Sequence, residues 1–171
     1  MKSKNIFNTK IAGYILLILA GLIIILYFFF MDIQQQNGTQ NNSASQNEDL
    51  TAEQKHVLFE QGTEAPFSSD LLNEKRVGTY YAADTKEPVF RSEDKFDSGT
   101  GWPSFTRPVN ADAVKEHTDE TLGMTRIEVT SSEGGHLGHV FSDGPKEETG
   151  LRYCINGDAL YFVPDEEKKS E

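Results

Sequence analysis

The feature that most constrains this chain is an apolar run from Ile11 to Met31 that contains no charged residue. About twenty residues in a helix that rises about 1.5 Å per residue span the roughly 30 Å hydrocarbon core of a bilayer. Lysines stand at positions 2, 4 and 10, and the next basic residue is Lys55. This asymmetry predicts a transmembrane helix over residues 11–31, a cytoplasmic segment over residues 1–10 and an extracytoplasmic remainder.

A cleaved signal peptide is the alternative interpretation of the same run. The apolar part of a signal peptide is normally about 7–15 residues long, which is shorter than this run. The nearest cluster of small residues, Ser43–Ser45, lies well beyond its end. The sequence therefore favours a retained single-pass anchor in the cell membrane.

Residues 32–49 are rich in Gln, Asn and Ser and contain little that a core could bury. This composition predicts a flexible polar linker that holds the following domain away from the bilayer. The whole chain carries a formal net charge of −11. Nucleic acid is therefore not expected as a partner, because phosphate binding needs clustered Lys and Arg.

The residues after the linker predict a mainly β domain over residues 50–164 and a charged tail over residues 165–171. Short β-branched or aromatic runs, most of them bounded by Gly, Asp, Asn or Pro, are typical of antiparallel strands. Such runs occur at residues 77–81, 88–90, 124–130, 136–141, 151–155 and 159–163.

Two short helices are expected beside these strands. Thr51 and Gln54 have the spacing of a capping box, which predicts a helix from Thr51 to about Gln61. A second small helix is expected around Asp112–His117, with Asn110 or Asp112 as its N-cap.

The single cysteine, Cys154, excludes an intrachain disulfide framework and a zinc site built mainly from thiolates. In a strand, alternation places Arg152, Cys154 and Asn156 on one face and the two residues between them on the other. A guanidinium on that face would favour a thiolate by its charge. A buried, inert cysteine is the alternative, and the polar neighbours count against it.

Two histidines three residues apart, His136 and His139, are open to more than one interpretation. They could bind a metal ion together with Asp143 or Glu133, although no further His or Cys with ligand spacing stands nearby. They could instead donate a proton or orient a substrate in a thiol reaction. The third possibility is that they are ordinary strand residues that bond to the backbone.

The only tryptophan, Trp102, stands in a turn between two glycines and Pro103. A large aromatic side chain on a rigid turn is either a core residue or one wall of a pocket. Considered alone, the core is the more common place for it.

Taken together, these segments resemble a known family, the B-type methionine sulfoxide reductases. The resemblance covers residues 50–163 and also includes Leu50–Gln54 and Gly62–Phe67. Its main motifs occur in the order found in the family: KFDSGTGWPSF (95–105), GMTRIE (123–128), GHLGHVFSDGP (135–145) and GLRYCIN (150–156).

The resemblance implies a fold of two antiparallel sheets that lean together, with a few short peripheral helices. It also implies roles for individual side chains. The attacking cysteine is Cys154, the polar residues around it are His136, His139 and Asn156, and the substrate side is formed by Trp102, Phe141 and Arg152.

Two departures from the family pattern bear on the cofactor and the reductant. Many relatives bind a structural zinc ion through two Cys-x-x-Cys pairs, and the corresponding stretches here are AADT (82–85) and TSSE (130–133). Zinc is therefore not expected, nor any other cofactor. Many relatives also place a resolving cysteine where this chain has Thr100. Oxidised Cys154 is therefore expected to need an external thiol.

The activity implied is reduction of methionine-R-sulfoxide in oxidised proteins, with a sulfenic acid formed on Cys154. The expected partners are the oxidised proteins and a thioredoxin-like reductant with a Cys-x-x-Cys pair. A catalytically silent β module and a thiol hydrolase using Cys154 and His139 are the alternatives. The retained Cys, His and Asn residues count against the module, and the lack of an obvious oxyanion device counts against the hydrolase.

Overall fold

The computed structural model describes residues 22–31 and 49–166, which belong to two separate compact units. Residues 22–31 form a helix with exposed side chains. The rest of the expected anchor (11–21), the N-terminal segment (1–10), residues 32–48 of the linker and residues 167–171 of the tail lie outside the described residues. Within the described part, no helix is both long and apolar enough to cross a bilayer.

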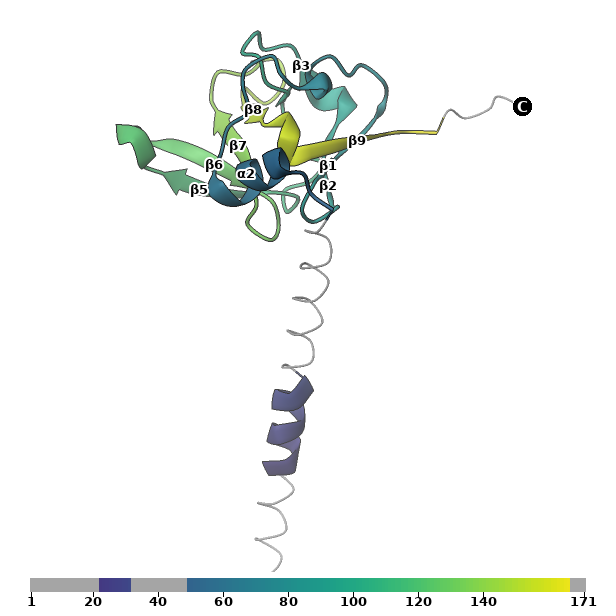
Figure 1. The fold of residues 1–171 in the computed structure, drawn as a ribbon, viewed down its shortest axis with the longest axis vertical. Coiled ribbons are helices and arrows are strands. Elements are labelled where there is room, and N and C mark those ends of the chain that lie inside the picture. The colour runs from purple at the N-terminus through teal and green to yellow at the C-terminus, as the bar shows by residue number, and fades with distance from the viewer. Residues whose placement is uncertain (1–21, 32–48, 167–171) are drawn as a thin grey trace, which may run out of the picture. The chain divides into compact units, whose positions relative to one another are not determined.

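The domain after the linker contains two antiparallel sheets, which confirms the expected mainly β class (Figure 1). The smaller sheet has the strand order β2-β1-β9 and the larger has the order β3-β4-β8-β7-β6-β5. The smaller sheet consists of β1 (Gly78–Ala82), β2 (Pro88–Arg91) and β9 (Leu160–Pro164). The larger consists of β3 (Lys95–Phe96), β4 (Ser104–Phe105), β5 (Lys115–Asp119), β6 (Arg126–Thr130), β7 (His136–Phe141) and β8 (Arg152–Ile155).

Helix α2 (Ala52–Glu60) begins where the capping box predicts it. Thr51 and Gln54 each accept the other's backbone N–H through their side chains, at 3.2 and 3.0 Å. The helix packs against β7 and against η4 (Gly157–Ala159), one of four 3₁₀ turns in the domain. The other three are η1 (Asp70–Leu72), η2 (Ser92–Asp94) and η3 (Thr121–Gly123).

The prediction of a second helix around Asp112–His117 is wrong, because these residues lead into strand β5. Asn110 does cap backbone N–H groups: its side chain accepts from Asp112 at 2.9 Å. That contact closes a turn, and the chain then pairs with β6 from Lys115 to Asp119. The sequence KEHTD has no apolar periodicity of its own, so pairing with the neighbouring strand decides its conformation.

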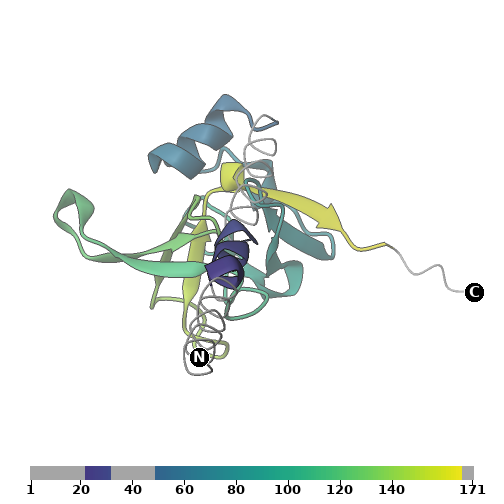
Figure 2. The ribbon, with the colours of Figure 1, turned by 90° about the horizontal axis from the view of Figure 1, so that it is seen from below.

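Strands β5 and β6 form a hairpin that extends beyond the rest of the larger sheet (Figure 2). The side chains of β5 are largely exposed, whereas Val129 and Thr130 at the far end of β6 are buried. The hairpin therefore joins the core only at its base and carries polar side chains alongside β7.

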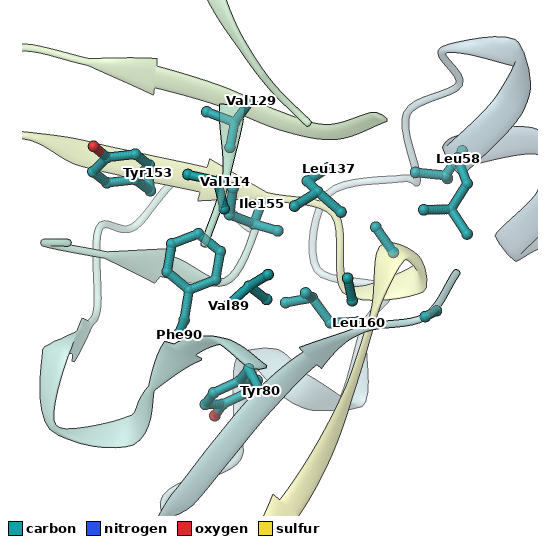
Figure 3. Close-up of a cluster of buried hydrophobic side chains, with 14 of the residues drawn as sticks. Leu58, Tyr80, Val89, Phe90, Val114, Val129, Leu137, Tyr153, Ile155 and Leu160 are labelled. Carbon is teal, nitrogen blue, oxygen red and sulfur yellow. The ribbon is translucent and has the colours of Figure 1, made fainter. Parts of the chain in front are cut away.

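The hydrophobic core lies between the two sheets (Figure 3). Phe90 of the smaller sheet stacks on Phe105 of the larger, with ring centroids 4.4 Å apart, and Tyr80 meets Phe105 edge-on at 4.9 Å. Leu137 and Ile155 are fully buried in the same cluster. Burial of large apolar and aromatic side chains is the main stabilising contribution to such a domain.

Strand β8 contributes to this core with every second residue. Tyr153 and Ile155 are buried in the cluster, and Arg152 and Cys154 are on the opposite, half-buried side. The predicted alternation is confirmed for these four residues. Packing of Tyr153 and Ile155 therefore fixes the direction in which Cys154 points.

We predict that Gly138→Ala destabilises the domain by about 2–3 kcal/mol, because strands β7 and β8 approach too closely for a side chain there. A Cβ atom at Gly138 would lie 2.1 Å from the carbonyl oxygen of Cys154. Urea unfolding measures the loss. Gly123→Asn is the control, since a Cβ at Gly123 meets no atom within 4 Å and its φ of +71° lies at the edge of the left-handed region that Asn adopts. Equal stability of the two variants would contradict the prediction.

Candidate active site

Cys154 lies within the larger sheet, on the face of β8 that is turned away from the core. In the strand register it pairs with Ser104 on β4 and with His139 on β7. Residues directly opposite on antiparallel neighbours share a face of the sheet, so these three side chains form a row across three strands. Cys154 is a free, half-buried thiol. The sheet therefore brings the predicted nucleophile and one predicted histidine together.

Both predicted histidines are paired with carboxylates of the β5–β6 hairpin. Nδ1 of His136 lies 2.7 Å from Oε1 of Glu128, and Nε2 of His139 lies 2.8 Å from Oδ2 of Asp119. The centroids of the two imidazole rings are 5.4 Å apart. A carboxylate that holds one ring nitrogen fixes the ring's orientation and leaves the other nitrogen to exchange a proton. The rings are thus held by carboxylate side chains.

Burial and neighbouring groups set the charge of the His139–Asp119 pair. Burial lowers the pKa of His139, and Asp119 opposes this effect. The pKa of Asp119 is held well below its usual range by hydrogen bonds from Thr121, and further by His139 and Arg126. Near neutral pH the pair is therefore a carboxylate beside a neutral imidazole, which can accept a proton.

The thiol of Cys154 has a raised pKa. Burial is the main cause, while the hydroxyl of Thr100 and the guanidinium of Arg152 lower the pKa without cancelling the effect of burial. The expectation that Arg152 favours the thiolate is right in direction, but the net effect is reversed because the sulfur is largely removed from water. In the resting site Cys154 is therefore a neutral thiol next to a neutral histidine.

Arg152 is held in place beside Cys154. Its Nε and Nη2 donate to the two carboxylate oxygens of Asp143 at 2.8 and 2.9 Å. Its guanidinium carbon lies 4.5 Å from the ring centroid of Phe141, a distance typical of a cation–π contact. The ring of Phe141 is in turn 6.4 Å from that of His139. Three predicted residues therefore form one continuous group on the face that carries Cys154.

Trp102 belongs to the turn between β3 and β4, two residues before Ser104. Its indole Nε1 donates to the carbonyl of Glu64 at 3.2 Å, and the side chain is half-buried. It does not belong to the buried cluster that forms the core of the described domain. The interpretation of Trp102 as a core residue is therefore wrong, and a place in the wall of a site fits its exposure.

Asn156 follows the last residue of β8, so strand alternation does not extend to it. Its Oδ1 accepts from the backbone N–H of Glu64 at 3.2 Å, and its Nδ2 donates to the carbonyl of Leu137 at 3.0 Å. The side chain is buried. Asn156 therefore joins β7 to the loop before η1 and holds the end of β8 in position.

Glu64 organises this loop, although no sequence pattern singled it out. Its buried carboxylate accepts from the backbone N–H groups of Gly157 and Asp158 at 2.7 and 2.8 Å. Burial raises the pKa of Glu64, while these two hydrogen bonds act in the opposite direction. Its backbone contacts both Trp102 and Asn156, so one residue positions two predicted site residues.

The two turns at residues 82–85 and 130–133, where many relatives have zinc ligands, are joined by a buried hydrogen bond. Ser131 Oγ donates to Asp84 Oδ2 at 2.6 Å and accepts from the N–H of Gly135 at 2.9 Å. Two carboxylates, Asp84 and Glu133, among hydroxyl groups do not provide the Cys and His ligands of a structural zinc site. Nowhere in residues 22–31 and 49–166 do three or more His, Cys, Asp or Glu side chains gather in a way that could hold a metal ion.

Sequence reasoning missed mainly the partners of the residues that it identified. Asp119, Glu128 and Glu64 are separated from their partners by turns or by most of the domain, and isolated carboxylates have no signature of their own. One signal was present: Arg126, Glu128 and Thr130 alternate along a strand, which predicts that they share a face. Which histidine Glu128 meets depends on the register between β6 and β7, and this register is irregular at Val129–Thr130.

One β scaffold thus carries a free thiol and two histidine–carboxylate pairs. The family model described as "SelR domain" matches residues 50–164. A protein of Agrobacterium fabrum named "Peptide methionine sulfoxide reductase MsrB" is 53% identical over 118 residues, which are 68% of this chain and 87% of that protein. One of the same name from Chromohalobacter salexigens is 50% identical over 118 residues, or 68% and 89% of the two chains. The chain therefore belongs to the SelR-domain family of B-type methionine sulfoxide reductases.

We predict that alkylation of Cys154 by iodoacetamide rises with pH and has its midpoint above the ordinary thiol value of about 8.5. The raised pKa means that the thiolate, which is the reactive form, becomes populated only at higher pH. Mass spectrometry of the alkylated chain measures the rate at a single site, because the chain has one cysteine. A midpoint clearly below that value would show that Arg152 outweighs burial.

Proposed function

We propose that this chain reduces the R epimer of methionine sulfoxide in oxidised proteins. Its family shows that it is an oxidoreductase that acts on methionine sulfoxide. The observation that carries the proposal is the row formed by Cys154 and His139 on adjacent strands, with Asp119 bound to Nε2 of the imidazole. The row provides a nucleophile for the sulfoxide sulfur and a proton carrier for its oxygen.

The reaction starts with transfer of the thiol proton from Cys154 to His139. A neutral imidazole can accept this proton, and Asp119, which raises the pKa of His139 against the effect of burial, stabilises the imidazolium that forms. The thiolate then attacks the sulfoxide sulfur while the imidazolium returns the proton to the sulfoxide oxygen. The oxygen moves to Cys154, so the sulfoxide is reduced to methionine and the cysteine is oxidised to a sulfenic acid.

Two aromatic side chains, one on the turn before β4 and one on β7, suit the methyl side of the substrate. Trp102 and Phe141 offer apolar faces for the methyl group on the sulfur. Arg152 covers one face of Phe141 and donates to both carboxylate oxygens of Asp143. Asn156 and Glu64 act as positioning residues for the turn that carries Trp102.

We predict that Cys154→Ser abolishes reduction of a methionine-R-sulfoxide peptide, because a serine hydroxyl at neutral pH is a far weaker nucleophile than a thiolate. The S epimer is expected to remain unreduced by both wild type and variant. Chromatography of the two epimers measures both rates, and a thermal unfolding curve checks that the variant folds. Equal turnover by wild type and by the Cys154→Ser variant would show that Cys154 is not the catalytic nucleophile.

The sulfenic acid is expected to be reduced by a thiol from another molecule. Thr100 has no sulfur and the chain has no second cysteine, so water is released only when an external thiol condenses with the sulfenic acid. We propose a thioredoxin-like partner with a Cys-x-x-Cys pair, whose second thiol then frees Cys154. No zinc or other cofactor takes part in these steps.

We propose further that residues 11–31 anchor the chain in the cell membrane and that the catalytic domain is extracytoplasmic. The lysines before the run and the polar linker after it support this orientation. Outside the membrane the cytosolic thiol pools are absent, so a membrane-linked reductant fits this location.

Trapping of a mixed disulfide tests whether a thioredoxin-like protein reduces oxidised Cys154. When the second cysteine of such a reductant is changed to Ser, a mixed disulfide with Cys154 is expected to accumulate, because the release step is blocked. Non-reducing electrophoresis detects the adduct, and dithiothreitol should dissolve it. Normal turnover in a strain whose trapped partner forms no adduct would point to small-molecule thiols instead.

A further inference from the structure

Three hydroxyl groups form a continuous chain from the sulfur of Cys154 to a backbone carbonyl. The Oγ1 of Thr100 lies 3.9 Å from the Sγ of Cys154 and 2.8 Å from the Oγ of Ser98. Ser98 Oγ is 2.8 Å from Ser104 Oγ, which donates to the carbonyl oxygen of Trp102 at 3.1 Å. Ser104 is buried and Ser98 and Thr100 are half-buried, so bulk water does not readily replace these partners.

The number of hydrogens in this chain fixes its direction. Each hydroxyl has one hydrogen to donate. The carbonyl of Trp102 can only accept, so Ser104 is the donor in that contact. Each of the other contacts then holds one hydrogen only when Ser98 donates to Ser104 and Thr100 donates to Ser98. The contact with Cys154 is then one in which the thiol S–H donates to Thr100. All the donors therefore point away from the sulfur.

A thiolate needs the opposite arrangement, because it has no hydrogen to donate and is stabilised by donors. Without the thiol hydrogen, three hydrogens serve four contacts, so one contact loses its hydrogen bond. When Thr100 donates to the sulfur, both 2.8 Å contacts keep their hydrogen bonds if Ser98 turns to donate to Thr100 and Ser104 turns to donate to Ser98, and the longer 3.1 Å contact is the one given up. Ser104 then no longer donates to the carbonyl of Trp102. Forming the thiolate thus costs the chain one hydrogen bond at the turn that carries the aromatic side chain.

We propose that Thr100, Ser98 and Ser104 act as one switch, which points away from Cys154 in the thiol and turns toward it in the thiolate. The switch couples activation of the nucleophile to the backbone of Trp102, the residue that contacts substrate in the function proposed above, on which this coupling rests. No proton is transferred along the chain, because the hydroxyls only rotate about their C–O bonds. The thiol proton leaves toward His139 on β7.

Other charged groups near Cys154 do not depend on this switch. Arg152 on β8 favours the thiolate and Asp143 opposes it, and the two are joined by a bidentate ion pair whichever way the hydroxyls point. His139 on β7 is held by Asp119. Substitutions at Thr100 and Ser98 therefore change what the hydroxyl groups contribute to the pKa of Cys154, while these charged groups stay in place.

The switch makes predictions of opposite sign for two neighbouring residues. Thr100→Val removes the only hydroxyl that can donate to the thiolate, so the pKa of Cys154 should rise by about one unit. Ser98→Ala removes the group that competes for the hydrogen of Thr100, so the pKa should fall by about half a unit. Thr100→Ser should restore the wild-type value, because it keeps the hydroxyl.

Iodoacetamide alkylation of the full chain across a pH series, followed by mass spectrometry, measures these pKa values without any sulfoxide. Ser132→Ala is the matched control, because the hydroxyl of Ser132 donates to Glu87 and not to the three-hydroxyl chain. The pKa of Cys154 in this variant should equal that in wild type. If the proposed function is wrong, wild type will not turn over methionine-R-sulfoxide, but the alkylation results will be unaffected. The two proposals therefore fail separately.

A higher pKa in Thr100→Val together with a lower pKa in Ser98→Ala supports the switch. An unchanged or raised pKa in Ser98→Ala overturns it, since a loop that is merely loosened has no reason to favour the thiolate. An unchanged pKa in Thr100→Val also overturns it. If Thr100→Val does not fold, Ser98→Ala alone decides, because only the directional chain predicts a lower value.

Discussion

The position of strand β8 between β4 and β7 is the constraint on which the rest of the site depends. Its backbone ladders set Cys154 opposite Ser104 on one side and opposite His139 on the other. The buried faces of Tyr153 and Ile155 lock the strand's orientation, because a slip by one residue would expose both and bury Arg152. The same packing that stabilises the core thus decides which groups stand beside the sulfur.

Around that sulfur the two groups that exchange a proton in the proposed reaction, Cys154 and His139, are both uncharged at rest. Burial keeps Cys154 protonated and His139 neutral, so both groups change charge when the proton moves between them. Asp119 and Arg152 are each tied to partners, and their charges therefore support the transfer without titrating in its range. At rest such a site holds a neutral thiol.

Much of this could be predicted from the sequence, where a local pattern determines the structure. The capping box at Thr51, the apolar alternation of β8 and the short β runs all depend on neighbours within a few residues. The strand β5 and the carboxylate partners could not be predicted this way, because KEHTD and the side chains of Asp119 and Glu128 acquire their roles from pairing across strands. Glu64 is harder still: its carboxylate is bound by residues more than ninety positions away.

The central claim is that Cys154 itself takes the oxygen from the sulfoxide and needs another molecule to release it. Mixing the protein with an excess of methionine-R-sulfoxide peptide in the absence of any thiol tests this directly. The account predicts that about one methionine forms per chain, that turnover then stops, and that Cys154 carries one added oxygen in the mass spectrum. Repeated turnover without a thiol, or methionine formed while Cys154 stays a free thiol, would contradict it.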